Sequence, residues 1–257
     1  MIRIFGGVLL LLSGAQAAAQ DSIIGLTLGG GVQSNPTYFG SDTAETTFAP
    51  VLEVDRLKFG PIDLGGGEAT DGFGFKGGFR FISERTPDDG AELTGLTDID
   101  AALEIGGGIE WSDIPDGITR NWGSYSFAEA RYGVIGHEAV VGEAGADLIY
   151  APNDQLAFRF GPRLFGGDDD FTATYFGVTA DEAAASDFTA FTPTGGVLSR
   201  GVKAQVNYAI NDLWGVEGTV SYSEFLNDAA NSPIVQGGST EQTSIGLTLS
   251  RKLDFRF

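Results

Sequence analysis

The stretch from Ser244 to Phe257 reads SIGLTLSRKLDFRF and alternates between apolar and polar side chains. One parity carries the apolar residues, which are Ile245, Leu247, Leu249, Leu253, Phe255 and Phe257. The other parity carries Gly246, Thr248, Ser250, Lys252, Asp254 and Arg256. Only Arg251 interrupts the apolar parity. Because successive side chains of a strand point to opposite faces, this pattern predicts a β-strand with one apolar face and one polar face.

A strand of this kind that ends on an aromatic residue resembles the closing strand of a bacterial outer-membrane β-barrel. In such barrels the apolar face meets lipid and the polar face lines the lumen. The resemblance implies that Leu253, Phe255 and Phe257 form the signal that the barrel-insertion machinery reads. A secreted β-sandwich also alternates, but it does not account for the terminal aromatic residue.

The amino terminus has the features of a secretory signal peptide. Arg3 precedes an apolar run from Ile4 to Leu12, and Ala17-Ala18-Ala19 forms a small-residue cleavage site. The apolar run is much shorter than the roughly 20 residues that a membrane-spanning helix needs. We therefore expect residues 1–19 to be removed and residues 20–257 to form one outer-membrane barrel.

Composition supports this expectation and excludes several other classes of protein. The chain has 39 glycines, 19 phenylalanines and 42% hydrophobic residues, yet no apolar run long enough for a spanning helix. It contains no cysteine, which excludes disulfides and a lipoprotein anchor. The formal net charge of −20 makes binding of nucleic acid implausible. The acidic clusters fall mostly between strand candidates, which is typical of solvated loops.

Twelve segments carry strand-like alternation. The clearest run through residues 73–81 and 99–111, where charged residues occupy the parity opposite to the apolar ones. Weaker candidates begin near Ser22, Glu45, Leu57, Trp122, Glu138 and Phe171. A charge that faces lipid near the midplane costs roughly 2–4 kcal/mol, so the charged parity is predicted to face the lumen. The predicted lumen charges are Lys76, Arg80, Glu104, Glu110, Arg159, Arg163, Lys203 and Glu217.

These patterns predict an all-β fold, an antiparallel up-and-down transmembrane barrel of twelve strands, with ten as the alternative. Periplasmic turns of such barrels are short and outer loops are longer. With a periplasmic amino terminus, the tight periplasmic turns would be Asp55-Arg56, Gly136-His137 and Asn211-Asp212. The longer outer connections would be 35–44, 112–121, 179–198 and 226–242. Two connections disagree with the rule, since 83–98 is long but periplasmic and 151–154 is short but outside.

Several loop sequences are distinctive enough to indicate a family. They are PTYFGS at 36–41, YFGVT at 175–179, and LNDAANSPIV at 226–235. This set, in this order and with the terminal Phe257, resembles the MltA-interacting protein (MipA)/OmpV family of outer-membrane proteins. The residues that carry the resemblance are Pro36, Tyr38, Gly40, Ser41, Tyr175, Phe176, Gly177, Val178, Asp228, Ala229, Ser232 and Pro233.

The resemblance implies an outer-membrane barrel without catalytic residues. It also implies a scaffold that joins a murein-degrading lytic transglycosylase to a murein (peptidoglycan) synthase in the Gram-negative envelope. Other members of the family are discussed as adhesins, osmolarity-responsive proteins or entry points for antibiotics. The signature loops either pack together and plug the barrel mouth, or they bind a ligand or partner. The Asp181–Ser186 stretch would form one short helical turn capped by Thr179 or Asp181.

Enzymatic chemistry is poorly supported by the residue types. The single histidine, His137, lies in a predicted tight turn, so a Ser-His-acid triad is improbable. Lumen-parity acids and bases are more simply read as ion pairs, among them Glu129, Glu143, Asp147 and Arg131. With no cysteine and one histidine, no metal or cofactor site is expected. The glycine triplets at 29–31, 65–67 and 106–108 lack the context of a phosphate loop and are interpreted as strand glycines.

The sequence therefore predicts a non-enzymatic protein of the bacterial outer membrane that contacts lipid and lipopolysaccharide. The leading function is a scaffold for murein enzymes on the periplasmic face, through the Ser83–Asp98 connection. A small-solute pore and a surface adhesion or ligand-binding protein are the alternatives.

Overall fold

The computed structural model describes residues 22–59, 62–65, 71–115 and 119–256. The predicted signal peptide, the glycines at 66–67 and Phe257 lie outside these ranges. In the described part, eleven strands form one antiparallel sheet in the order β3-β2-β1-β11-β10-β9-β8-β7-β6-β5-β4. The strands are β1 (Ile23–Pro36), β2 (Ala44–Phe59), β3 (Ile62–Gly65), β4 (Gly72–Ile82), β5 (Ala102–Asp113), β6 (Trp122–Ile135), β7 (Val140–Tyr150), β8 (Leu156–Gly167), β9 (Gly196–Ala209), β10 (Trp214–Phe225) and β11 (Glu241–Arg256).

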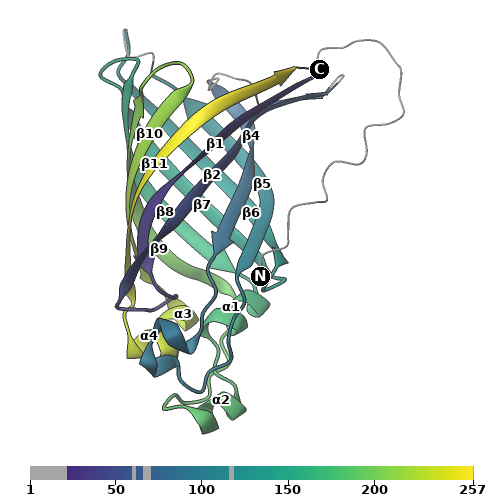
Figure 1. Cartoon of the computed structure of the whole chain (residues 1–257), viewed down its shortest axis with the longest axis vertical. Helices are drawn as coiled ribbons and strands as arrows, with labels where there is room; N and C mark the ends of the chain where they lie inside the picture. Colours follow the sequence, from purple (N-terminus) through teal and green to yellow (C-terminus); the bar gives the residue numbers. More distant parts are fainter. Residues whose placement is uncertain (1–21, 60–61, 66–70, 116–118, 257) are drawn as a thin grey trace.

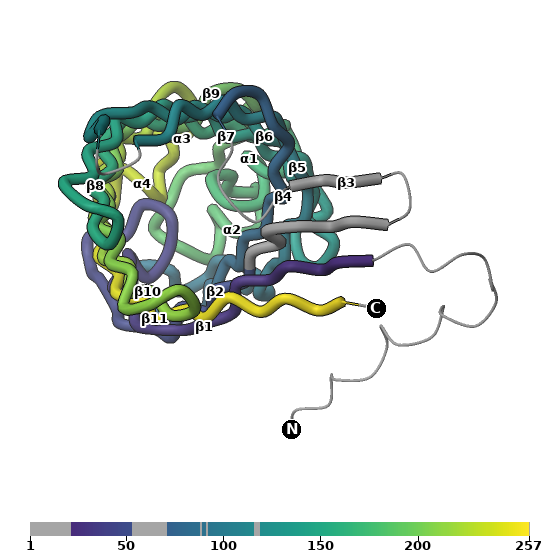
Figure 2. Tube along the Cα trace, turned by 90° about the horizontal axis from the view of Figure 1, so that it is seen from above, coloured from purple at the N-terminus to yellow at the C-terminus, as the bar shows by residue number. Residues whose placement is uncertain are grey.

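The sheet curls into a barrel (Figures 1 and 2). β1 pairs with β11, which brings the first and last strands together, and β4 contacts both β2 and β3 at the seam. β3 has four residues and runs in the same direction as β4, so together they occupy one place between β2 and β5. The described residues thus contain ten long strands, in agreement with the alternative of ten, and the expectation of twelve was wrong.

Two expected strands account for the difference. Asp55 and Arg56, expected to form a tight turn, lie inside β2, so no new strand begins near Leu57. The segment from Phe171 belongs to a helix and not to a strand. The strand candidates near Ser22, Glu45, Trp122 and Glu138 correspond to β1, β2, β6 and β7.

All the described helices gather at one end of the barrel, which we call the loop end (Figure 1). It holds the connections after β1, β4, β6, β8 and β10. The opposite end, the turn end, holds the connections after β5, β7 and β9 and the paired strand ends Ile23 and Arg256. The helical segments are η1 (Pro87–Asp89), η2 (Ala91–Leu93), α1 (Asp169–Phe176), α2 (Ala180–Ala185), α3 (Asn227–Asn231) and α4 (Pro233–Gly237).

The loss of the strand at Leu57 inverts every strand up to Phe171 relative to our expectation. The Gly136-His137 turn and the Ser83–Asp98 connection therefore lie at the loop end, and not at the same end as the Asn211-Asp212 turn, where they were expected. The connections at 112–121 and 151–154 lie at the turn end. The Asn211-Asp212 turn keeps its expected place at the turn end, because it follows the second lost strand. If the loop end is the outer end, 83–98 and 151–154 obey the length rule, whereas the longer 112–121 connection and the tight Gly136-His137 turn depart from it.

The outer face of the barrel is apolar. Phe73 and Phe75 are 65% and 63% exposed, and their lumen-parity neighbour Lys76 ion-pairs with Glu129. Exposed aromatic residues gather near the turn end, namely Trp111, Trp122, Tyr208 and Trp214. Arg251, the polar residue on the apolar parity, places its guanidinium 5.5 Å from the Trp214 ring centroid. An apolar band with an aromatic belt at its edge is the surface that a lipid bilayer requires.

Among the described residues, no helix combines the length and the apolar character needed to cross a membrane. Glycines of the 106–108 triplet allow a close approach of the neighbouring backbone. A Cβ added at Gly106 or Gly108 would overlap the carbonyl oxygen of Ala130 or Ala128 on the neighbouring strand.

Candidate functional site: loop plug, charged lumen and mouth pocket

The loop end is closed by a hydrophobic plug built around α1. Asp168 caps the helix, since its Oδ1 accepts from the Phe171 amide at 2.9 Å and its Oδ2 from the Val140 amide at 2.7 Å. These two bonds fix the start of α1 to the start of β7. Phe171 and Phe176 are fully buried on the inner face of the helix. The residues that pack around them include Phe39, Ala139, Val141, Leu198, Phe225, Ala229 and Val235.

The signature loops hold this plug together. Ser232 Oγ donates to Phe176 O at 2.7 Å, and the Tyr38 hydroxyl donates to Glu92 Oε1 at 2.7 Å. Burial, followed by the neighbouring Glu92 carboxylate, raises the pKa of Tyr38. Asp228 Oδ2 accepts from both the amide and the hydroxyl of Thr194 at 2.8 Å. These bonds join four separate connections.

The remaining signature residues also lie at the loop end. Gly40 has φ +100° and fits against Val235, a conformation and a space that favour glycine. The others lie in or beside the plug. Three of them are buried, namely Ser41, Val178 and Ala229. The rest occupy element ends or α1: Pro36 ends β1, Tyr175 lies in α1, Gly177 is the C-cap of α1, and Pro233 begins α4. The geometry matches the alternative in which the signature loops pack together.

An ion network lies in the lumen beneath the plug. Arg131, 3% exposed, donates from Nε to Glu104 Oε2 at 2.9 Å and also pairs with Glu129 and Glu143. Glu129 pairs in turn with Lys76. Because three carboxylates surround Arg131, its buried charge is compensated within the barrel.

His137 connects this network to the plug. Its Nδ1 accepts the Ala139 amide at 3.1 Å, so its Nε2 carries the hydrogen that faces Glu104 Oε1 at 3.3 Å. The imidazole ring packs edge-on against Phe171, with ring centroids 5.1 Å apart. The single histidine therefore links the lumen network to the plug.

A second charged cluster lies nearer the turn end. Arg163 binds Asp147 through two contacts, from Nη1 to Oδ1 at 2.6 Å and from Nη2 to Oδ2 at 3.0 Å. Arg159 Nε lies 3.7 Å from Asp147 Oδ2, and the guanidinium carbon Cζ of Arg159 lies 4.3 Å from the Tyr125 ring centroid. The Tyr125 hydroxyl donates to Glu110 Oε2 at 2.8 Å. The ring of Tyr125 thus bridges a cation and an anion, a role that the sequence pattern did not indicate.

Three predicted lumen charges stand apart from both clusters. Arg80 lies over the Phe165 ring at 4.8 Å, below the plug. Glu217 accepts from Thr219 Oγ1 at 2.9 Å. Lys203 occupies the lumen parity of β9, and within the described ranges it forms no ion pair.

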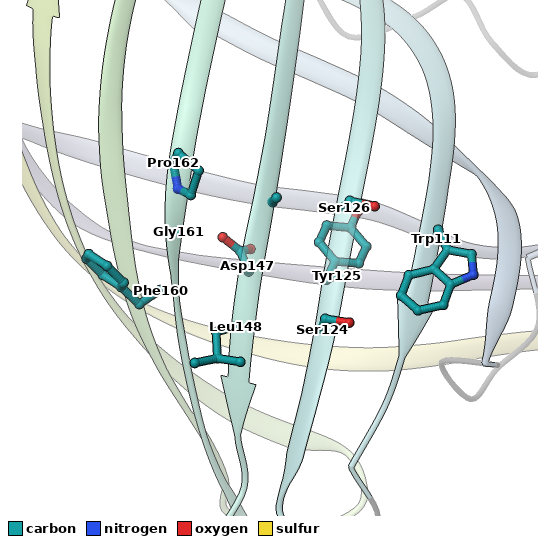
Figure 3. A pocket seen from close by; sticks show the side chains of 10 residues that line it. Trp111, Ser124, Tyr125, Ser126, Asp147, Leu148, Phe160, Gly161 and Pro162 are labelled. Carbon is teal, nitrogen blue, oxygen red and sulfur yellow. The ribbon is translucent and has the colours of Figure 1, made fainter.

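The wall of the barrel carries a shallow pocket of about 440 Å³ near the turn end (Figure 3). Trp111, Leu148 and Phe160 surround smaller residues from β6, β7 and β8. The β7–β8 pairing skips the positions opposite Gly161 and Pro162, since Pro162 has no amide hydrogen to donate. This pocket opens on the apolar, outward-facing side of the sheet.

A second pocket of about 410 Å³, which we call the mouth pocket, opens at the loop end between three connections. It is polar, and its lining includes Arg85, Thr97, Asp98, Ile99, Asp100, His137, Thr174, Thr179 and Glu182. The expected helical turn at 181–186 forms one wall as α2, capped by Thr179. Arg85 appears in the sequence only as one polar residue of a long loop, and no motif marks it.

The mouth pocket contains one carboxylate that is strongly stabilised in its charged form. Glu182 accepts from the Thr179 amide at 2.8 Å and the Thr97 amide at 2.9 Å. Burial raises the pKa of Glu182, but the bonds from Thr179 and Thr97 outweigh it and lower the value to about 2. Within the described ranges, no group of three or more His, Cys, Asp or Glu residues could hold a metal ion.

Comparison with known proteins gives a consistent result. A curated relative, the outer membrane protein Omp26La of Vibrio anguillarum, is 36% identical over 81 residues, which are 32% of this chain and 30% of the relative. The match thus spans about a third of that relative's length.

Among solved structures, the COG4313 outer membrane channel from Pseudomonas putida F1 is 12% identical, with a TM-score of 0.43 over 92% of this chain and 97% of the channel. The NanC porin is 10% identical, with a TM-score of 0.38 over 91% of this chain and 99% of the porin. Both likenesses are low, and the barrel assignment rests on the strand pairing.

The family described as MltA-interacting protein MipA matches residues 28–253, which include every signature loop and all described strands apart from the outermost residues of β1 and β11. This span also contains the plug, both lumen clusters and the mouth pocket. The chain is an all-β barrel of the outer membrane, and it belongs to the MltA-interacting protein MipA family.

Proposed function

We propose that this protein is a non-enzymatic outer-membrane scaffold that binds a murein enzyme of the lytic-transglycosylase class on the periplasmic side. The observation that carries the proposal is the match of residues 28–253 to a family named for its interaction with MltA. Residues 1–19 would act as the secretory signal, and residues 20–257 would form the barrel. A murein synthase is the second partner that the family resemblance implies.

The partner would bind at the turn end. The connections that carry helices gather at the loop end, and the opposite end has short turns apart from the 112–121 connection. This asymmetry is typical of outer-membrane barrels with short periplasmic turns. The turn end would then face the periplasm, where murein lies. The Ser83–Asp98 connection would face outward, so it no longer serves as the periplasmic contact.

The plug argues against the alternative of a permanently open pore. Fully buried Phe171 and Phe176 lie across the loop end, and the lumen below them contains paired charges. A solute would have to displace packed aromatic side chains, and a dry aromatic core does not conduct ions.

The test uses charge reversals at the two ends of the detergent-folded barrel. Asp154→Lys with Asp212→Lys changes two exposed turn-end residues, and Asp181→Lys with Asp187→Lys makes the same charge change at the loop end. Binding of a purified MltA-type lytic transglycosylase is measured by biolayer interferometry at two salt concentrations. We expect the turn-end pair to weaken binding by roughly tenfold or more and the loop-end pair to leave it unchanged.

The outcomes separate the parts of the proposal. No binding by the unmodified barrel would reject the scaffold function. Binding that responds only to the loop-end pair would reject the placement of the partner at the turn end. Equal loss with both pairs would indicate a general charge effect and would also reject the placement.

A further inference from the structure

The wall of the mouth pocket contains a buried arginine, Arg85. Arg85 is 6% exposed, and the one hydrogen bond of its guanidinium to the described residues runs from Nη1 to Tyr175 O at 3.3 Å. Within the described ranges, no carboxylate forms an ion pair with it. Burial lowers the pKa of Arg85, as expected for a guanidinium removed from water. Buried arginines are ordinarily paired, so an unpaired one that lines a pocket indicates a missing anionic group.

The position of Arg85 is fixed by its backbone. The Arg85 amide donates to Ile99 O at 2.8 Å, and the Ile99 amide donates to Arg85 O at 2.9 Å. This β-bridge joins the two arms of the 83–101 connection and holds Arg85 next to α1. There the backbone carbonyl of Tyr175 accepts the hydrogen bond from the guanidinium. The guanidinium is thus held in place before any ligand arrives.

The same pocket offers unpaired carboxylates at its rim. Asp98 and Asp100 flank Ile99, line the pocket and are exposed. Their side chains form no hydrogen bond or ion pair with the described residues. The Glu182 carboxylate differs, because it already accepts hydrogen bonds from the Thr179 and Thr97 amides. The pocket therefore contains one cation, Arg85, at its buried wall and three carboxylates. Glu182, already hydrogen-bonded, acts through its charge on Arg85 without a direct ion pair, whereas the two rim carboxylates are available to a ligand.

We propose that the mouth pocket binds a small zwitterion, with the ligand carboxylate at Arg85 and the ligand ammonium at Asp98 and Asp100. A guanidinium presents parallel N–H donors that match the two oxygens of a carboxylate. A dianion such as phosphate would meet repulsion from the rim, and a simple cation would leave Arg85 unpaired. The volume of about 410 Å³ lies in the range of small-molecule sites and exceeds the needs of a single glycine.

Glycylglycine is a suitable probe, because two analogues each remove one of its charges. N-acetylglycylglycine keeps the carboxylate without the ammonium, and glycylglycinamide keeps the ammonium without the carboxylate. Binding to the detergent-folded mature barrel is measured by isothermal titration calorimetry. We expect glycylglycine to bind at least roughly tenfold more tightly than either analogue. No binding of glycylglycine, or equal binding of N-acetylglycylglycine, would overturn the proposal.

Variants test the named residues. Arg85→Met should abolish binding of glycylglycine, and unchanged binding would overturn the assignment of the carboxylate. Asp98→Asn with Asp100→Asn alters only exposed side chains, and it should remove the preference for glycylglycine over N-acetylglycylglycine. If Arg85→Met fails to fold by circular dichroism, the rim variant decides, since a retained preference would reject the proposal. Failure here leaves the scaffold proposal untouched, because that concerns the opposite end of the barrel.

Discussion

Replacement of Arg131 by methionine tests whether the lumen network stabilises the barrel. Arg131 is 3% exposed and contacts three carboxylates, of which Glu104 and Glu129 have side chains 0% and 6% exposed. Without the guanidinium, Glu129 keeps Lys76, whereas among the described residues Glu104 keeps only the 3.3 Å contact with His137. One buried carboxylate would then lack a cation.

Removal of one partner from a buried ion pair typically costs about 3–5 kcal/mol, and we expect a loss of stability in this range for Arg131→Met. Arg200→Met is the matched control, since Arg200 and its partner Glu224 have side chains 63% and 41% exposed. Loss of such an exposed pair costs about 0–1 kcal/mol. Adding Glu104→Gln to Arg131→Met should restore part of the loss, because the uncompensated charge is then also removed.

The measurement is reversible urea unfolding from lipid vesicles, followed by tryptophan fluorescence and extrapolated linearly to zero urea. A loss for Arg131→Met no larger than that for Arg200→Met would refute the reasoning. So would a double variant less stable than Arg131→Met, because it would mean that Glu104 carries no unfavourable charge in the single variant.

Three further predictions concern the plug, the loop helix and the strand glycines. Phe176→Ala removes a fully buried ring from the plug and should raise single-channel conductance in a planar bilayer above that of the unmodified protein; unchanged conductance would mean that another element closes the lumen. The pKa of Glu182 falls from 4.5 to about 2 on folding, so its stabilisation of α2 is present above pH 4.5 and is lost as the pH falls toward 2. Hydrogen-exchange protection of α2, corrected for intrinsic rates, should decline over this window, and Glu182→Gln should flatten the profile. Gly161→Ala should impair folding, since a Cβ would overlap Ala146 O, whereas Gly215→Ala meets only atoms at ordinary distances and should fold normally, as circular dichroism can show.

The direction of most strands was predictable only in part, and one polar pair explains why. Asp55-Arg56 interrupts an apolar run as a turn would, yet β2 continues through it and pairs with β1 as far as Lys58. Whether two adjacent polar residues end a strand depends on the contacts with the neighbouring strands. Those contacts cannot be read from one segment of the sequence. Because a turn was expected at Asp55-Arg56, every later connection was assigned to the wrong end of the barrel, as far as the second wrongly expected strand near Phe171.

The second error had a local signal that could have prevented it. The pattern predicts a weak strand that begins near Phe171, although Asp168-Asp169-Asp170 precedes Phe171, Tyr175 and Phe176. A cap residue followed by acids and by apolar residues four and five positions apart is the pattern of an amphipathic helix. The helix is short because Gly177 ends it, and short helices leave weak periodicity.

The strand glycines leave the space that the charged side chains of the lumen network occupy. Parity predicts which charges face inward, but it does not predict which of them meet, because small neighbours decide where long side chains lie. Gly78 faces the Arg131 side chain, with a hypothetical Cβ 3.1 Å from its Cγ, and a Cβ at Gly133 would collide with the His137 ring. The glycines of β4 and β6 thus provide the space in which Arg131, Glu104 and His137 meet. A larger residue at either position would push apart the groups that compensate the buried charge, so these glycines and the charges are expected to depend on each other.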